Sequence, residues 1–147
     1  MVFLVSYVGA DHLAYDFDRI INRFNMKESG YHILRVGMAI TFLWIGILIF
    51  RDPESWGAMV QPWVLKLLPL PIKSMMLSIA VLDMLIGFFL LIDVFTWLLA
   101  LIGALHLVTV LAVTGINAIT VRDIGLLAGL LALVVTKFPR NQYTSSK

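Results

Sequence analysis

Ionisable side chains placed inside an apolar chain are its first candidates for chemistry. Asp83 and His106 each stand within a long apolar stretch. Arg122 and Asp123 are adjacent at the start of another. An imidazole beside a carboxylate can take up and release a proton near neutral pH. A buried arginine can bind an anionic ligand or pair with an acid on a neighbouring helix, so these residues predict a proton-handling or anion-binding site.

Arg35, near the start of the first apolar stretch, has two open interpretations. It could extend its guanidinium group to the membrane surface, as long cationic side chains do near helix ends. It could instead bind an anionic ligand or a lipid headgroup. His12 and His32 lie outside the apolar stretches, so His106 has no intramembrane partner for a bis-histidine haem.

The composition places these residues in a membrane protein. The chain has 147 residues, of which 61% are hydrophobic and 14% are charged, against about 45–50% and 25% in soluble domains. The net charge is only +2 and no basic run occurs, so nucleic acid is not an expected partner. The absence of cysteine excludes cysteine-held zinc, iron–sulfur clusters and c-type haem. We expect no metal site and no cofactor held by the chain itself.

Four stretches are long and apolar enough to be read as membrane spans, which need about 20 residues each. They lie at roughly 33–50, 74–92, 94–115 and 120–137. The predicted fold is all-α, a membrane four-helix bundle, with the second and third spans forming a tight antiparallel hairpin that turns at Asp93.

Counting along this hairpin places Asp83 and His106 at the same depth. Asp83 is ten residues after Lys73 and His106 is nine residues before Gly115, or about 15 Å and 14 Å from the same surface at 1.5 Å per residue. We therefore expect the two side chains to meet. Such a pair either handles protons or only fixes helix packing, and the sequence leaves both alternatives open.

An even number of spans places both termini on one side of the membrane. Seven basic residues lie on that side and four on the other; the seven are Arg19, Arg23, Lys27, Arg35, Lys137, Arg140 and Lys147, and the four are Arg51, Lys66, Lys73 and Arg122. Because basic residues favour the cytoplasmic side, we expect a multi-pass protein of the cell membrane with both termini in the cytoplasm.

The segments around these spans carry further expectations. Residues 1–30 form an interfacial or docking segment, residues 31–139 the four-span domain and residues 140–147 a polar tail. An apolar stripe over residues 13–24 predicts an amphipathic helix that lies on the membrane surface or docks a partner subunit. The proline-rich loop 51–73 predicts a short interfacial helix, with a lid over a binding cavity as the alternative.

The fourth span carries small residues at helical spacing, namely Gly125, Gly129, Ala132 and Thr136. Such a stripe allows close approach of another helix, and Arg122 lies on the same face. We therefore expect Arg122 to point into the bundle and to neutralise an acid or an anionic ligand. Asp123 is expected to act largely as a capping residue in the first helical turn.

Three stretches together resemble the DoxX-like family of small four-span membrane proteins. They are "LRVGMAITFLWIGILIFRDPESW", "AVLDMLIGFFLLI" and "TVRDIGLLAGLLALVV", and the resemblance covers roughly residues 34–135. The positions that match are Arg35, Trp44, Asp83, Arg122 and Asp123, although the family's second span usually carries glutamate where this chain has Asp83. Relatives include the membrane subunit of thiosulfate:quinone oxidoreductase, so the resemblance implies a place beside quinone or other redox chemistry.

The sequence thus predicts an integral membrane subunit of a quinone-linked redox complex, with a quinone or lipid site. The candidate binding residues are Arg35, Trp44, Asp83, His106, Arg122 and Asp123. Expected partners are membrane lipids and other membrane subunits or further copies of the chain. The alternative is an accessory subunit that only stabilises a larger membrane complex, and the sequence does not decide whether the chain is an enzyme.

Overall fold

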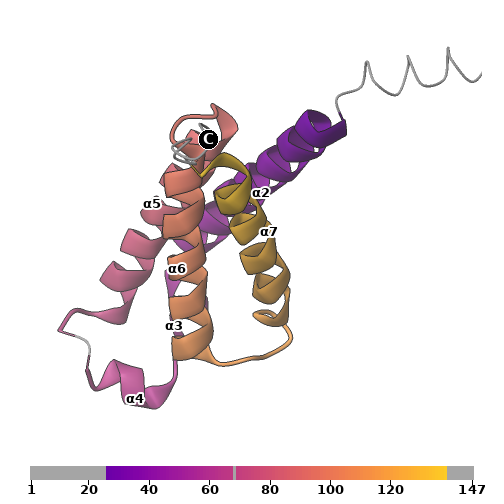
Figure 1. Cartoon of the computed structure of the whole chain (residues 1–147). Helices are drawn as coiled ribbons and strands as arrows, with labels where there is room; N and C mark the ends of the chain where they lie inside the picture. The colour runs from indigo at the N-terminus through magenta and orange to yellow at the C-terminus, as the bar shows by residue number, and fades with distance from the viewer. Residues whose placement is uncertain (1–25, 68, 139–147) are drawn as a thin grey trace, which may run out of the picture. The chain divides into compact units, whose positions relative to one another are not determined.

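The computed structural model describes residues 26–67 and 69–138, with side chains from residue 28 onward. Six helices follow one another: α2 (Met26–Arg51), α3 (Pro53–Gly57), α4 (Pro62–Leu65), α5 (Ile72–Leu91), α6 (Thr96–Thr114) and α7 (Val121–Lys137) (Figure 1). These described ranges contain no strand, which agrees with the all-α prediction. The amphipathic helix expected over residues 13–24 and the polar tail lie outside the described residues.

The chain divides into two units, residues 1–33 and 34–147. In the first unit, the described residues form the start of α2, where the rings of Tyr31 and His32 meet edge to face with their centroids 5.1 Å apart. All contacts described below lie within the second unit.

Three helical segments are long and apolar enough to cross a membrane: Glu28–Arg51, Ile72–Leu91 and Thr96–Thr114. They correspond to the first three predicted spans, as expected of a membrane protein. The fourth predicted span coincides with α7, which has 17 residues. At 1.5 Å per residue α7 is about 26 Å long, slightly shorter than the hydrocarbon core of about 30 Å.

The hairpin predicted at Asp93 is confirmed, since α5 and α6 are joined by residues 92–95 only. Asp93 and Phe95 adopt left-handed backbone angles, with φ of 60° and 48°. The hydroxyl of Thr96 donates a 2.6 Å hydrogen bond to the Asp93 carboxylate. Two non-glycine residues with positive φ reverse the chain within one short turn, and the Asp93–Thr96 bond stabilises this conformation.

Arg35 connects α2 to the end of this hairpin. Its Nη1 donates to the carbonyl oxygens of Leu90 and Leu91, and its Nε lies 3.6 Å from a carboxylate oxygen of Asp93. Carbonyls in the last helical turn have no partner within the helix and carry partial negative charge. Arg35 is only 8% exposed. Its guanidinium group is therefore bound within the protein at the α5–α6 turn, an arrangement that the two interpretations from the sequence did not include.

The backbones of α2 and α5 approach each other at two glycines. A Cβ atom built on Gly87 would lie 2.7 Å from the backbone nitrogen of Leu43 and 2.8 Å from the carbonyl oxygen of Ala39. A Cβ atom on Gly46 would lie 2.8 Å from the carbonyl oxygen of Ala80. Small residues on both helices permit this contact, which fixes how α2 and α5 cross.

Side chains from three other helices meet over Gly103 of α6. A Cβ atom there would lie 3.2 Å from Leu130 of α7, 3.4 Å from Phe42 of α2 and 3.6 Å from Ile86 of α5. Phe42, Ile86 and Leu130 are among the largest fully buried side chains. The apolar core of the second unit is therefore built by all four long helices.

Helix α7 is rotated relative to the sequence prediction. Of the small-residue stripe, Gly129 faces α2, because a Cβ there would overlap Met38, but Gly125 has no atom within 4 Å of the corresponding position. The buried face of α7 instead carries Asp123, Leu130 and Leu133. Leu130 and Leu133 are fully buried, so this face of α7 packs through large side chains rather than through the glycine stripe.

The loop between α2 and α5 folds against the helices rather than away from them. Two prolines, Pro53 and Pro62, begin its short helices α3 and α4, a position where proline is well tolerated. Val60 and Val64 are buried against the α2–α5 pair. The backbone nitrogen of Gln61 donates a 2.9 Å hydrogen bond to the carbonyl of Val113, so the loop is also connected to the end of α6.

The start of α3 is capped by an exposed aspartate. The backbone nitrogen of Ser55 donates to the carboxylate of Asp52 over 3.2 Å. Hydrogen bonds from Ser55 lower the pKa of Asp52 below its ordinary value. The cap therefore contributes to stability at neutral pH and is lost in acid, as the carboxylate becomes protonated.

We expect Gly87→Ala and Gly37→Ala to have opposite effects on stability. Alanine favours a helix over glycine by about 1 kcal/mol, and Gly37 has open space where the methyl group would lie. At Gly87 the methyl group would meet backbone atoms of α2, and overpacking of this kind costs about 1–3 kcal/mol. Thermal unfolding in detergent should give a lower Tm for Gly87→Ala and an equal or higher one for Gly37→Ala. Equal Tm values for both variants would contradict the close α2–α5 contact.

Candidate functional site

A cavity of about 90 Å³ lies among the long helices and the first loop. Its wall is mainly apolar, with Phe42 and Ile45 from α2, Met75 and Met76 from α5, and Trp56 from α3. A few polar side chains also line it, namely Asp83, His106, Thr114, Thr120, Arg122 and Asp123. A mostly apolar pocket with a few converging polar groups is the usual form of a small-molecule site.

Asp83 and His106 face each other across the α5–α6 hairpin. The Nε2 atom of His106 lies 3.2 Å from Oδ1 of Asp83, and the two side chains are 11% and 4% exposed. The predicted contact between them is therefore confirmed. It arises because the short turn at Asp93 sets the two residues at the same level on adjacent antiparallel helices.

Oδ1 of Asp83 is buried and accepts no well-aligned hydrogen bond from the described part of the chain, despite its short distance to His106. A buried polar atom without such a bond costs about 1–3 kcal/mol. Asp83 is one of the residues around the cavity, so a small shift of its side chain would let this oxygen accept a hydrogen bond from a donor placed there. The pair is therefore suited to hydrogen-bond a ligand and to exchange a proton with it.

Arg122 and Asp123 also line the cavity, and Asp123 lies in the first turn of α7 as expected. Nε of Arg122 lies 3.6 Å from Oδ1 of Asp123, and the side chains are 48% and 7% exposed. Asp123 is thus the buried member, and it lines the same cavity as Asp83 and His106. Arg122 does pair with an acid, but the prediction that it points into the bundle is wrong, because α7 turns Asp123 inward instead.

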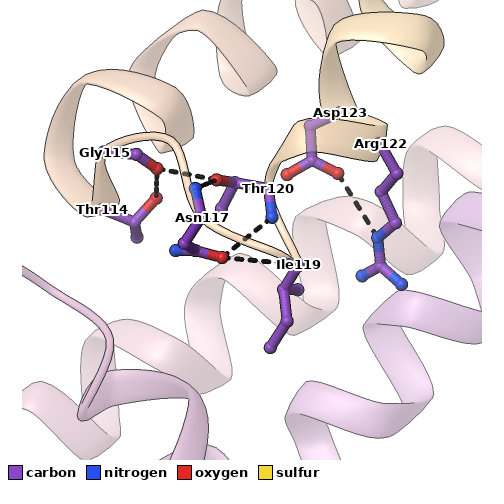
Figure 2. Close-up of polar contacts among 7 residues, drawn as sticks. All are labelled: Thr114, Gly115, Asn117, Ile119, Thr120, Arg122 and Asp123. Carbon is purple, nitrogen blue, oxygen red and sulfur yellow. Dashed lines mark hydrogen bonds and ion pairs between the residues drawn. The ribbon is translucent and has the colours of Figure 1, made fainter.

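The loop before α7 explains why Asp123 is not needed as a cap (Figure 2). The side-chain oxygen of Asn117 accepts hydrogen bonds from the backbone nitrogens of Ile119 and Thr120, over 2.8 Å and 3.1 Å. The Thr120 hydroxyl donates to the carbonyl of Gly115 over 2.7 Å and accepts from the Asn117 nitrogen over 2.9 Å. These bonds fix the entry into α7, so the Asp123 carboxylate faces the cavity.

The remaining two candidates do not belong to this cavity. Trp44 is 62% exposed on α2 and lines a separate outer groove. Arg35 is bound at the α5–α6 turn, beside Leu90 and Leu91, seven to eight residues along α5 from Asp83. The structure therefore brings together Asp83, His106 and Asp123, with Arg122 at the edge, and separates Arg35 and Trp44 from them.

The sequence reasoning did not identify Thr120 or Trp56 as lining residues. Thr120 is buried at the end of the α6–α7 loop. A turn there could have been predicted from the spacing of Gly115, Asn117 and Thr120, and such a turn brings Thr120 back against the helices. Trp56 lines the cavity from a loop that was expected to lie at the membrane surface. No group of three or more potential metal ligands occurs within the described ranges.

We expect Arg122→Leu to destabilise the protein more than Lys73→Leu. Loss of Arg122 leaves a buried carboxylate unpaired, and breaking a fully buried pair costs about 3–5 kcal/mol of unfolding free energy. Because Arg122 itself is half exposed, solvent screens the pair, and we expect a loss of about 2 kcal/mol. Lys73 pairs with Glu54 at 3.2 Å, but both side chains are mainly exposed, so its loss should cost at most about 1 kcal/mol.

The double variant Arg122→Leu/Asp123→Leu should recover most of this loss, since apolar residues often replace a buried ion pair without cost. Unfolding free energies measured in one detergent supply the comparison. The interpretation fails if Arg122→Leu is no more destabilising than Lys73→Leu.

No protein-family model, curated protein or solved structure matches the chain. The resemblance to the DoxX-like family therefore stays a prediction from three short sequence stretches.

Proposed function

We propose that the chain is an integral membrane subunit of a redox complex and that its cavity binds the polar head of a quinone. The observation that carries this proposal is the buried Asp83–His106 pair, which lies at a mainly apolar cavity. A quinone offers carbonyl oxygens on an apolar ring. Its reduction consumes two electrons and two protons to give a quinol, so it needs proton donors beside those oxygens.

The residues of the cavity match this requirement in their chemistry. His106 can donate a hydrogen bond to a quinone oxygen, and Asp83 can stabilise the imidazolium or accept the proton that returns when a quinol is oxidised. Asp123 supplies a second buried carboxylate near the pair. The two carboxylates and the imidazole together could exchange the two protons of a quinone–quinol cycle.

The electrons would come from a partner subunit. The sequence contains no cysteine, and the described ranges hold no cluster of metal-ligating side chains. The resemblance to a family that includes a quinone-linked membrane subunit supports this division of labour. In this proposal the chain positions and protonates the quinone, while the partner carries the redox centre.

The size of the cavity sets a condition on ligand entry. An engineered protein cavity of about 150 Å³ holds one benzene ring, whereas this one measures about 90 Å³. Met59, Met75 and Met76 are among its lining residues, and methionine side chains adapt readily to a new shape. We propose that these side chains move aside, and that the first loop, which covers the cavity through Trp56, acts as its lid.

We further propose that α7 is the fourth span of a four-helix membrane bundle and that both termini lie in the cytoplasm. Its side chains contribute to the same core as the three longer apolar helices. A helix a few ångströms shorter than the bilayer core can be accommodated by local thinning at modest cost.

A structural role is the second candidate. The Asp83–His106 contact joins α5 to α6, and interhelical polar contacts of this kind contribute about 0.6 kcal/mol on average in membrane bundles. An accessory subunit that only stabilises a larger complex would use the pair for packing alone.

Asp83→Asn separates the two functions. The amide keeps the shape and can still bond to His106, so the variant should fold, but it cannot accept a proton. We expect binding of decylubiquinol, the reduced form whose hydroxyl group can donate to the carboxylate, to weaken about tenfold in calorimetry, because a hydrogen bond to a charged acceptor is replaced by one to a neutral amide oxygen. Asp52→Asn, an exposed aspartate outside the cavity, is the matched control. Unaltered binding in Asp83→Asn, or no binding by the wild type, would contradict the proposed quinone site and favour the structural role.

The topology is tested by tags on both ends of the chain. With four spans, N-terminal and C-terminal epitopes should be protected or exposed together when intact cells are compared with permeabilised ones. If only α2, α5 and α6 cross the membrane, the two tags would appear on opposite sides.

A further inference from the structure

A groove separate from the central cavity runs between α2 and α7. It encloses about 310 Å³ and is lined by residues of α2 between Ile40 and Leu48, together with Arg122 and Leu126 of α7. Ile40 and Trp44 are more than half exposed. The groove is therefore open along its length, unlike the central cavity.

Among the described residues that line the groove, Arg122 is the charged one. The Thr41 hydroxyl already donates to the carbonyl of Gly37 over 2.8 Å, so it is not available to a ligand as a donor. Figure 2 shows that Arg122 approaches Asp123 through Nε, while its two terminal nitrogens point away from that carboxylate. A guanidinium group can bind a second anion through these atoms.

The polar and apolar parts of the groove are arranged along its length. Arg122 is the second residue of α7 and Leu48 lies three residues before the end of α2, so both stand near the loop-bearing ends of their helices. From Leu48 to Ile40 the α2 wall continues for eight residues, which corresponds to about 12 Å at 1.5 Å per residue. A cation at one end of an extended apolar surface matches a molecule with an anionic head and an alkyl chain.

We propose that this groove binds an anionic membrane phospholipid, with its phosphate at Arg122 and one acyl chain along α2 beside Trp44. The inference rests on the membrane placement of α2 and α7 but not on quinone binding. An arginine beside hydrocarbon is costly, and a phosphate partner at the end of α7 offsets part of this cost. Free inorganic phosphate would satisfy Arg122 but leave the apolar part of the groove unused.

The test uses Trp44 as a reporter. The chain has four tryptophans, and replacing Trp56, Trp63 and Trp97 by phenylalanine leaves Trp44 alone. The protein is reconstituted in phosphatidylcholine vesicles that contain a minor fraction of phosphatidylglycerol with brominated acyl chains, which quench tryptophan on contact. We expect brominated phosphatidylglycerol to quench Trp44 more strongly than brominated phosphatidylcholine does at the same mole fraction.

Arg122→Gln should lower this preference about fivefold, which corresponds to about 1 kcal/mol, the usual attraction of one basic residue to anionic lipid. Arg51→Gln, which removes an exposed arginine at the end of the same α2, should retain it. Leu126→Phe, which narrows the groove without removing Arg122, should also reduce it. If Arg122→Gln does not fold, Arg122→Gln/Asp123→Asn removes the unpaired acid and should show the same loss.

Three results would overturn the proposal. Equal quenching of the wild type by the two brominated lipids would show that the groove has no preference for an anionic head. An unchanged preference for the anionic lipid in Arg122→Gln would show that residues other than Arg122 cause it. Shielding of Trp44 from both lipids would indicate that a second protein chain fills the groove. Asp83→Asn should leave the lipid preference intact, because Asp83 does not line the groove. The quenching experiment therefore tests the lipid proposal independently of the quinone proposal.

Discussion

A charged side chain buried among apolar helices must find its partner inside the protein, and this requirement accounts for much of the arrangement described here. Arg35 binds the carbonyl ends of α5 and the Asp93 turn. That turn sets the register of α5 against α6 and so places Asp83 beside His106. Each contact offsets a desolvation cost that would otherwise oppose insertion of the chain into a bilayer. The polar contacts therefore determine which apolar surfaces can pack together.

The sequence predicted well those features that depend on length and on counting. Hydropathy located the three long spans, and the small number of residues around Asp93 required an antiparallel hairpin. Equal distances from the helix ends then placed Asp83 and His106 at the same depth. These inferences succeed because helical rise per residue is nearly constant, so position in the sequence converts directly into position along a helix.

The same reasoning was wrong about helix rotation, and it did not foresee contacts to main-chain acceptors. The glycine stripe of α7 suggested one inward face, but the two leucines and Asp123 occupy that face. Arg35 finds its partners in main-chain carbonyls, and these exist at every position of any sequence. The Asn117–Thr120 turn, which frees Asp123 from capping, also depends on a local hydrogen-bond geometry that hydropathy does not report.

The contact between Gly87 and the backbone of α2 has a consequence for how the cavity can change its volume. Two helices whose main chains already touch cannot move closer, and separating them would open an empty space between their small residues. The α2–α5 pair is therefore a fixed wall. Beyond movement of the methionine side chains, any backbone movement that enlarges the cavity must come from the opposite side, by displacement of the first loop or of the first turn of α7. The ionisable pair anchored on α5 and α6 would stay in place while the apolar wall around it adjusts.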